Sequence, residues 1–162
     1  MILNEATVKE IRTRMVGYPS RRSAILPALT TAYRQVGHLN PDIYEEISGI
    51  IDIPVVDIAE AASFYTLFPK KEVGRYFIQV CHNISCSLRG ADNMITYIEG
   101  KLGIKLGETT PDKIFTLISV ECLGGCSAAP MMQINDTYSE DLTREKIDRI
   151  RAELKAKAIA GR

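Results

Sequence analysis

Apolar side chains in residues 4–68 recur at spacings of three and four, which is the period of one face of an α-helix. Ser23 is the expected cap of a second helix and Gly37 its stop, whereas Asn40 and Pro41 open a third and Pro54 a fourth. Four short helices joined by short loops predict a small bundle. Its apolar residues are, in chain order, Val8, Ile11 and Met15, then Ile25, Leu29, Ala32, Tyr33 and Val36, then Ile43 and Ile47, and finally Val55, Ile58 and Ala62.

The pattern changes after Pro69 to short runs of aromatic and β-branched residues, which are typical of strands. Strands are expected over 75–80, 114–120 and 131–134, with a short return strand at Thr137 and Tyr138. This order predicts an α/β (α+β) fold with a helical bundle over 1–70 and a second domain over 71–162. Two helices are expected in the second domain, one marked by Leu88, Ala91, Ile95, Ile98 and Leu102 and ended by Gly103, and one marked by Ile147, Ile150 and Leu154 after the cap Thr143.

Composition and short motifs exclude several classes of function. Twenty basic and twenty acidic residues cancel, which argues against nucleic acid as the main partner. The N-terminus lacks the pattern of a signal peptide, and the apolar runs are too short to span a bilayer, so we expect a cytoplasmic chain with no direct membrane insertion. There is no dinucleotide or phosphate-binding fingerprint and no defensible acid/base pair, so no catalytic residue is expected.

The four cysteines form two pairs, Cys81 with Cys86 and Cys122 with Cys126, each following a predicted strand. If the two strands share a sheet, their exit loops can bring four thiolates together at one edge, as a four-cysteine site requires. Three interpretations compete: a [2Fe-2S] cluster, a structural zinc ion in an interaction module, and a thiol redox site. Spacings of C-x4-C and C-x3-C fit the first best, because zinc knuckles and thioredoxin-like redox motifs usually use C-x-x-C.

The residues around both pairs favour the cluster. A helix is expected to begin at Ser87, so that its free N–H groups would stabilise charge on Cys86. Gly124 and Gly125 would let backbone amides approach the sulfur atoms. His82 is expected to be an ordinary loop residue, and the apolar stretch 63–68 is expected to be buried.

With these residues in view, the chain resembles the thioredoxin-like [2Fe-2S] subunits of bacterial NADH dehydrogenases, and also those of NAD-linked hydrogenases and formate dehydrogenases. The resemblance spans about residues 18–154. It is carried by YPSRRSAILPAL (18–29), GHL (37–39), SFYTLF (63–68), VGRYFIQVCHNISCSLRGA (73–91) and VECLGGCSAAPMMQIND (120–136). One departure is Pro111-Asp112-Lys113, where many relatives have Asp-Gly before the strand.

The resemblance implies an N-terminal helical bundle, a thioredoxin-like [2Fe-2S] ferredoxin domain, and a ligand role for each of the four cysteines. It implies an electron-transfer subunit that is not an enzyme alone and that belongs to a larger iron–sulfur redox complex. NADH and FMN are expected on a partner flavoprotein, since a flavin must separate the two electrons of NADH for a one-electron cluster. The alternative assemblies are a hydrogenase, a formate dehydrogenase or an electron-bifurcating complex.

Overall fold

The computed structural model describes residues 1–160. The chain divides into two compact units, Met1–Glu72 and a second unit that begins at Val73. Across the described residues, no helix combines the length and the apolar character that a membrane crossing requires.

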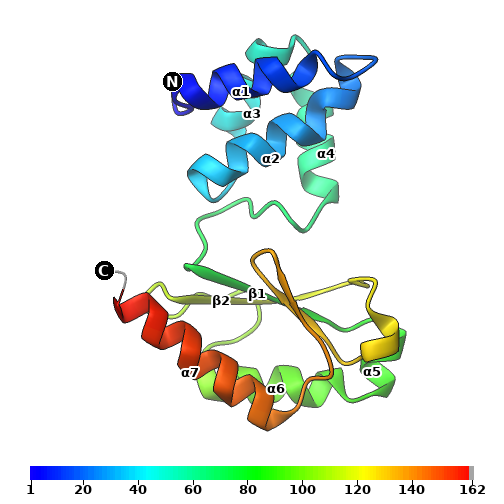
Figure 1. The fold of residues 1–162 in the computed structure, drawn as a ribbon, viewed down its shortest axis with the longest axis vertical. Helices are drawn as coiled ribbons and strands as arrows, with labels where there is room; N and C mark the ends of the chain where they lie inside the picture. Colours follow the sequence, from blue (N-terminus) through cyan, green and yellow to red (C-terminus); the bar gives the residue numbers. More distant parts are fainter. Residues whose placement is uncertain (161–162) are drawn as a thin grey trace. The chain divides into compact units, whose positions relative to one another are not determined.

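The first unit is helical and contains α1 (Glu5–Met15), η1 (Arg22–Ala24), α2 (Ile25–Val36), α3 (Pro41–Ile51) and α4 (Val55–Phe64) (Figure 1). Its helices begin where their sequences supply caps: the side chain of Asn4 accepts from the N–H of Thr7, and that of Asn40 from the N–H of Ile43. The predicted apolar faces form one core. Its fully buried members include Ile11, Leu29, Ala32, Leu39, Ile43, Ile47, Ile51, Ile58 and Ala62.

One predicted helix start needs correction. Ser23 lies inside η1, and the residue before α2 is Ala24, which makes no side-chain capping bond. The expectation that Pro54 opens the fourth helix is confirmed, since Pro54 is the N-cap of α4.

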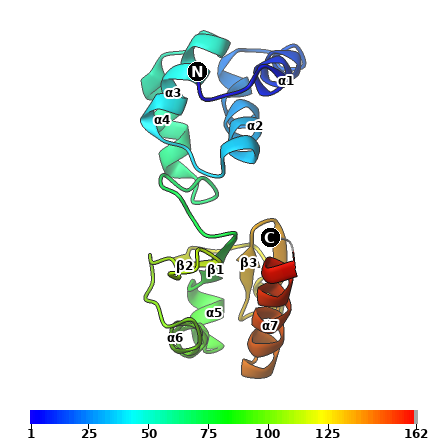
Figure 2. The same cartoon turned by 90° about the vertical axis from the view of Figure 1, so that its left-hand side faces the viewer.

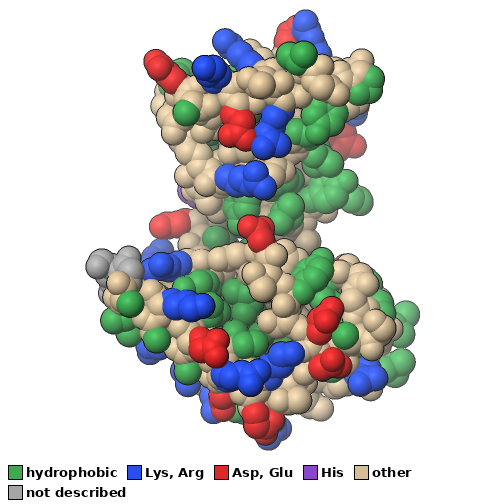
Figure 3. All heavy atoms as spheres, viewed as in Figure 1, with side chains coloured by type: hydrophobic (Ala, Val, Ile, Leu, Met, Phe, Trp, Pro, Cys, Tyr) green, Lys and Arg blue, Asp and Glu red, His purple; other side chains and the backbone are tan. Residues whose placement is uncertain are grey.

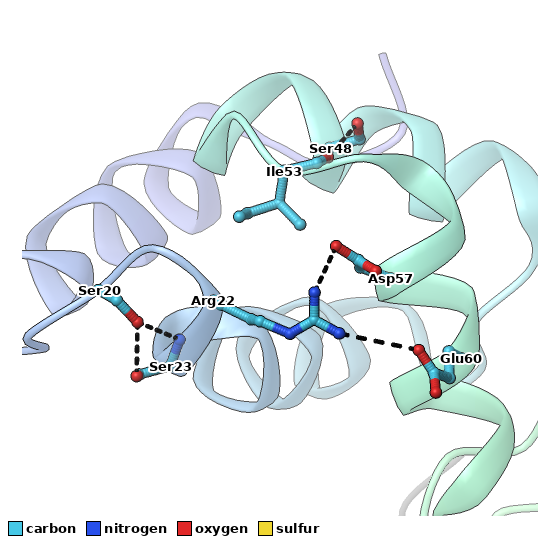
Figure 4. A network of polar contacts seen from close by, with 7 residues as sticks. All are labelled: Ser20, Arg22, Ser23, Ser48, Ile53, Asp57 and Glu60. Atoms are coloured by element: carbon cyan, nitrogen blue, oxygen red, sulfur yellow. Dashed lines mark hydrogen bonds and ion pairs between the residues drawn. The ribbon is translucent and has the colours of Figure 1, made fainter.

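Hydrogen bonds and ion pairs between polar groups connect the helices and turns of this unit (Figure 4). The guanidinium of Arg22 donates to Asp57 Oδ2 at 2.8 Å, and its second nitrogen lies 3.9 Å from Glu60 Oε2, which joins η1 to α4. The Ser48 hydroxyl donates to the carbonyl of Ile53 at 2.7 Å and closes the connection from α3. Because Arg22 is largely exposed, these ion pairs contribute at most about 1 kcal/mol of stability.

The second unit is a four-stranded sheet with helices. In chain order it contains β1 (Tyr76–Cys81), α5 (Ile84–Leu88), α6 (Ala91–Leu102), β2 (Phe115–Val120), η2 (Cys126–Ala128), β3 (Met132–Ile134), β4 (Thr137–Ser139) and α7 (Arg144–Ala160). The strand order is β2-β1-β3-β4. Strands β1 and β2 are parallel, whereas the β1–β3 and β3–β4 pairs are antiparallel. Both views show α6 and α7 on the same face of the sheet (Figures 1 and 2).

One face of this sheet and the two long helices enclose a second core. Ile78 and Val80 of β1, Leu117 of β2, Ile98 of α6 and Ile147 of α7 are all buried in it. Since β1 and β2 are parallel, the chain must cross over between them, and α5 and α6 form this crossover. The ends of β1 and β2 therefore lie next to each other, and the loops that follow them start at the same end of the sheet.

The single helix predicted across residues 88–102 is two helices. Gly90 has φ 89°, a left-handed conformation that interrupts the helical path between α5 and α6. Cys86 lies in the middle of α5, so the expectation that it precedes a helix start at Ser87 is wrong. The cap of this first helix is Asn83, whose side chain accepts from the N–H of Ile84 at 2.9 Å.

The apolar stretch 63–68 is only partly buried, contrary to expectation. Phe68 is buried, but Phe64, Tyr65 and Leu67 are exposed. Figure 3 shows hydrophobic side chains gathered at the surface over the end of α4. The helical period explains the difference, because α4 ends at Phe64 and the residues after it no longer share the face that Ile58 and Ala62 bury.

Lys113 provides a test of backbone strain just before β2. It has φ 58°, and the other described non-glycine residues with positive φ are Asp52, Asn135 and Asp141. A lysine has a steric cost in this region that Asp and Asn tolerate better. We expect Lys113→Gly to stabilise the chain by about 0.5–1 kcal/mol in urea unfolding. Lys113→Ala keeps the Cβ and should give no such gain; equal gains from both would show that the side chain, not φ, matters.

Candidate cysteine site

All four cysteines lie at one end of the parallel β1–β2 pair. Cys81 is the last residue of β1, and its partner in the parallel ladder is Val120, the last residue of β2. Cys122 follows β2 by two positions, Cys86 lies in α5, and Cys126 begins η2. The strand register therefore brings together residues that are far apart in the sequence.

The thiols contact one another in two pairs. Cys122 Sγ lies 3.5 Å from Cys126 Sγ, and Cys81 lies close enough to Cys86 to raise the pKa of its thiol. The charge of Cys126 also raises the pKa of Cys86, so the two pairs adjoin each other. All four are free cysteines. The cysteine pairs predicted from sequence spacing are thus also pairs in space.

The two pairs differ in their exposure. Cys81 and Cys86 are buried, whereas Cys122 and Cys126 are exposed. Burial, and to a smaller extent the hydrogen bond with Cys81, raises the pKa of the Cys86 thiol to about 11. The pKa of Cys126 is also raised, first by its hydrogen bond with Cys122 and then by the charge of that neighbour. Protons must therefore leave these thiols before their sulfur atoms can ligate a metal.

The glycines between Cys122 and Cys126 have distinct local roles. Gly124 has φ 84°, and its N–H donates to Cys122 Sγ at 3.3 Å. The expectation that a glycine amide would approach a cysteine sulfur is confirmed at this position. A Cβ on Gly125 would lie 2.5 Å from Met131 Sδ, so the absent side chain makes room for this buried methionine.

The surroundings of the buried cysteines are apolar. Cys81 and Cys86 pack with Ala91, Ala129 and Met131, and the partly buried Leu123 adds to this cluster. On the outer side of α5, Ile84 and Leu88 are 74% and 83% exposed. Figure 3 shows hydrophobic side chains at the surface over this short helix. The site thus combines a water-excluding interior with an apolar surface.

The sequence analysis did not single out Asn83 and Glu121, two polar residues of the site. The amide of Asn83 donates to Glu121 Oε2 at 2.7 Å, and His82 Nε2 lies 3.6 Å from Glu121 Oε1. His82 is therefore a loop residue with an acidic neighbour. The capping preference of asparagine before Ile84 was the available signal for Asn83, but nothing local connects it to Glu121.

The donor set fits a cluster of two irons. Cys122 and Cys126 form one pair of thiols, and Cys81 and Cys86 form the other. In a [2Fe-2S] cluster with four cysteine ligands, each iron takes two thiolates from the protein. Two adjoining pairs of soft sulfur donors in a partly apolar site match that requirement.

These features define an α/β protein that gathers four free thiols at the ends of two parallel strands. The model of the thioredoxin-like [2Fe-2S] ferredoxin family matches residues 11–155. The chain belongs to this family, and the expected fold class, with its thioredoxin-like layer, is confirmed.

Similar proteins come from two kinds of complex. The chain is 46% identical over 140 residues to an E subunit (E 2) of NADH-quinone oxidoreductase from Rhizobium meliloti (strain 1021), covering 86% of this chain and 83% of that protein. It is 48% identical over 136 residues to the E subunit of NADH-quinone oxidoreductase from Rickettsia conorii (strain ATCC VR-613 / Malish 7), covering 82% of this chain and 81% of that protein.

The second kind of complex is represented by a solved structure. The crystal structure of NAD+-reducing [NiFe]-hydrogenase in the air-oxidized state matches with a TM-score of 0.69 and 25% identity. The match covers 82% of this chain but 23% of the hydrogenase chain, so this chain spans about a quarter of that chain's length.

Proposed function

We propose that this chain is the electron-transfer subunit of an NADH-oxidising complex and carries one [2Fe-2S] cluster. The observation that supports this most directly is the gathering of four free thiols, as two adjoining pairs, at the ends of β1 and β2. Membership of the thioredoxin-like [2Fe-2S] ferredoxin family supports the identity of the group.

The proposed ligands are Cys81 and Cys86 for one iron and Cys122 and Cys126 for the other. A [2Fe-2S] cluster supplies storage and transfer of one electron at a time. The chain's own contribution is to position and shield this group. The buried pair and its apolar neighbours limit the access of water, and the Gly124 N–H is directed at a ligand sulfur. Both features bear on a cluster's reduction potential.

The proposed partner is a flavoprotein that binds NADH and FMN. NADH gives up two electrons as a hydride, so a flavin is needed between it and a one-electron carrier. We therefore do not propose that this chain oxidises NADH alone. The exposed Ile84 and Leu88 beside Cys86 support a protein-covered site in the assembled complex, because adjacent exposed apolar side chains are typical of interaction surfaces.

The sequence identities favour one parent complex. Identity of 46–48% with the matching small component of NADH-quinone oxidoreductases, over most of each chain, supports an NADH:quinone oxidoreductase. The hydrogenase match at 25% identity keeps the equivalent subunit of an NAD-linked hydrogenase as a second candidate. The genes beside this one distinguish them, since only the second assembly requires a nickel–iron subunit.

We also propose a cytoplasmic location, with any membrane association made through partner subunits. The four cysteines are free thiols, which a reducing compartment preserves. Balanced charge adds no reason to expect direct binding to an anionic membrane surface.

Anaerobic stopped-flow mixing with NADH tests the proposed division of labour. The purified chain, free of flavin, should show no rapid bleaching of its visible absorption. After addition of the NADH-binding flavoprotein from the same complex, bleaching should occur within the turnover time of that complex. Dithionite, which reduces the isolated chain directly, is the control for a reducible group. Rapid bleaching by NADH alone would contradict the proposal, as would no bleaching with the flavoprotein present.

A further inference from the structure

The side-chain amide of Asn83 is bonded at both ends. Its Oδ1 accepts from the N–H of Ile84 at 2.9 Å, and its Nδ2 donates to Glu121 Oε2 at 2.7 Å. Asn83 is the N-cap of α5, which carries Cys86, and Glu121 is directly bonded to Cys122 along the chain. One side chain therefore connects the segment of one cysteine pair to the segment of the other.

The bridge lies where the backbone ladder stops holding the two segments together. The parallel pairing of β1 and β2 ends at Cys81 and Val120, and one further backbone bond runs from the His82 N–H to the Val120 carbonyl at 3.0 Å. Beyond this point the chain on one side enters α5 and on the other enters the glycine-containing loop. A backbone bond from the Cys81 N–H to the Met131 carbonyl at 3.1 Å anchors the segment after Cys126, and the Asn83–Glu121 bond adds a side-chain link between the segments that carry Cys86 and Cys122.

We infer that Asn83 and Glu121 form a clamp that sets the separation between the Cys81–Cys86 pair and the Cys122–Cys126 pair. Asn83 is the positioning residue, and Glu121 is the acceptor that it requires. The inference rests on the proposed function, since the clamp matters only if all four thiolates hold one group. A hydrogen bond to a carboxylate is short and directional, so it holds position better than a neutral contact.

The neighbouring His82 does not perform this role. Its Nε2 lies 3.6 Å from Glu121 Oε1, beyond hydrogen-bond distance, and both side chains are substantially exposed. The hydrogen bond from the Asn83 side-chain amide to the same carboxylate is 2.7 Å long. It is 0.9 Å shorter than the 3.6 Å between His82 Nε2 and Glu121. The clamp therefore depends on Asn83.

Substitutions can separate the clamp from the helix cap. Asn83→Asp keeps a capping oxygen but places two carboxylates against each other. Asn83→Ser also keeps a capping oxygen and leaves the net charge of the pair unchanged, but it loses the amide donor. Glu121→Gln keeps an acceptor for Asn83. In the double variant Asn83→Asp/Glu121→Gln, the donor and acceptor exchange places, and the net charge of the pair equals that of the wild type. Asn40→Asp is the matched control, because Asn40 caps α3 in the first unit.

The test measures the rate of iron loss to a chelator and the midpoint potential in full-length chain purified without oxygen, with thermal unfolding as the check of folding. Asn83→Asp and Asn83→Ser should lose iron about tenfold faster than wild type, the effect typical of residues that orient metal ligands. The double variant should return to within about twofold of the wild-type rate and to its potential, and Asn40→Asp should match wild type.

Three results would overturn the inference. They are wild-type rates in both Asn83 variants, a double variant that loses iron as fast as Asn83→Asp alone, and an equal acceleration in Asn40→Asp. If all the variants hold iron as the wild type does, the proposed function survives and the clamp fails. A wild-type chain that binds zinc and no iron would reject the proposed function, and the clamp with it.

Discussion

Chain purified without oxygen is expected to carry about two iron atoms and about two acid-labile sulfides per molecule. The reason is the proposed donor set, because two adjoining thiol pairs would supply two thiolates to each of two irons. Reduction should produce a single spin-one-half signal in electron paramagnetic resonance, since one added electron leaves one unpaired spin.

Metal analysis and sulfide analysis of the same sample check this expectation. A chain loaded with zinc in the absence of iron is the control, as it gives the spectrum of a colourless site with the same ligands. If the native chain contains about one zinc per molecule and no iron, the electron-transfer function is wrong. A structural zinc ion in an interaction module would then be the better interpretation.

Single substitutions of the four cysteines by serine should have the second largest effect. A serine hydroxyl is a poorer iron ligand than a thiolate and ionises less readily. We expect iron occupancy to fall at least about tenfold in Cys81→Ser and Cys86→Ser, because losing a ligand should cost no less than losing a residue that only orients one. These two positions are buried, so water cannot replace the lost sulfur.

Cys122→Ser and Cys126→Ser should retain more iron than the buried pair, with shifted visible and magnetic spectra, because both positions are exposed to solvent. His82→Ala is the control, as His82 adjoins the proposed ligand Cys81 in the chain and its Nε2 lies 3.6 Å from Glu121, and it should keep the wild-type iron content. Loss of iron in His82→Ala with full retention in the serine variants would show that the ligand assignment is wrong.

Local rules were sufficient for much of the secondary structure. The helix α3 was predicted from its cap Asn40, the following Pro41, and the spacing of Ile43 and Ile47, all of which act within a few residues. The same rules failed between residues 84 and 102, where the positive φ of Gly90 separates α5 from α6. An apolar period continued through this break, so periodicity alone could not detect it.

Part of the candidate site could be predicted from the local sequence, and part depends on contacts between residues far apart in the chain. Cysteine spacing and the neighbouring glycines indicated the paired thiols and the amide directed at Cys122. The Asn83–Glu121 bond joins residues 38 positions apart, and a hydrogen bond at that separation depends on how strands align. Sequence rules that operate within one turn or one strand carry no information about such a partner.

The sequence by itself determined most of the segments that form helices and strands and that four thiols come as two pairs, because periodicity, capping and spacing act over short distances. Only the tertiary structure decided which of those thiols are buried and which side chains join the two pairs. The physical reason is the register of β1 on β2: by placing Cys81 opposite Val120, it brings α5 and the Cys122 loop side by side. A shift of one residue would turn the side chains of one strand to the opposite face of the sheet.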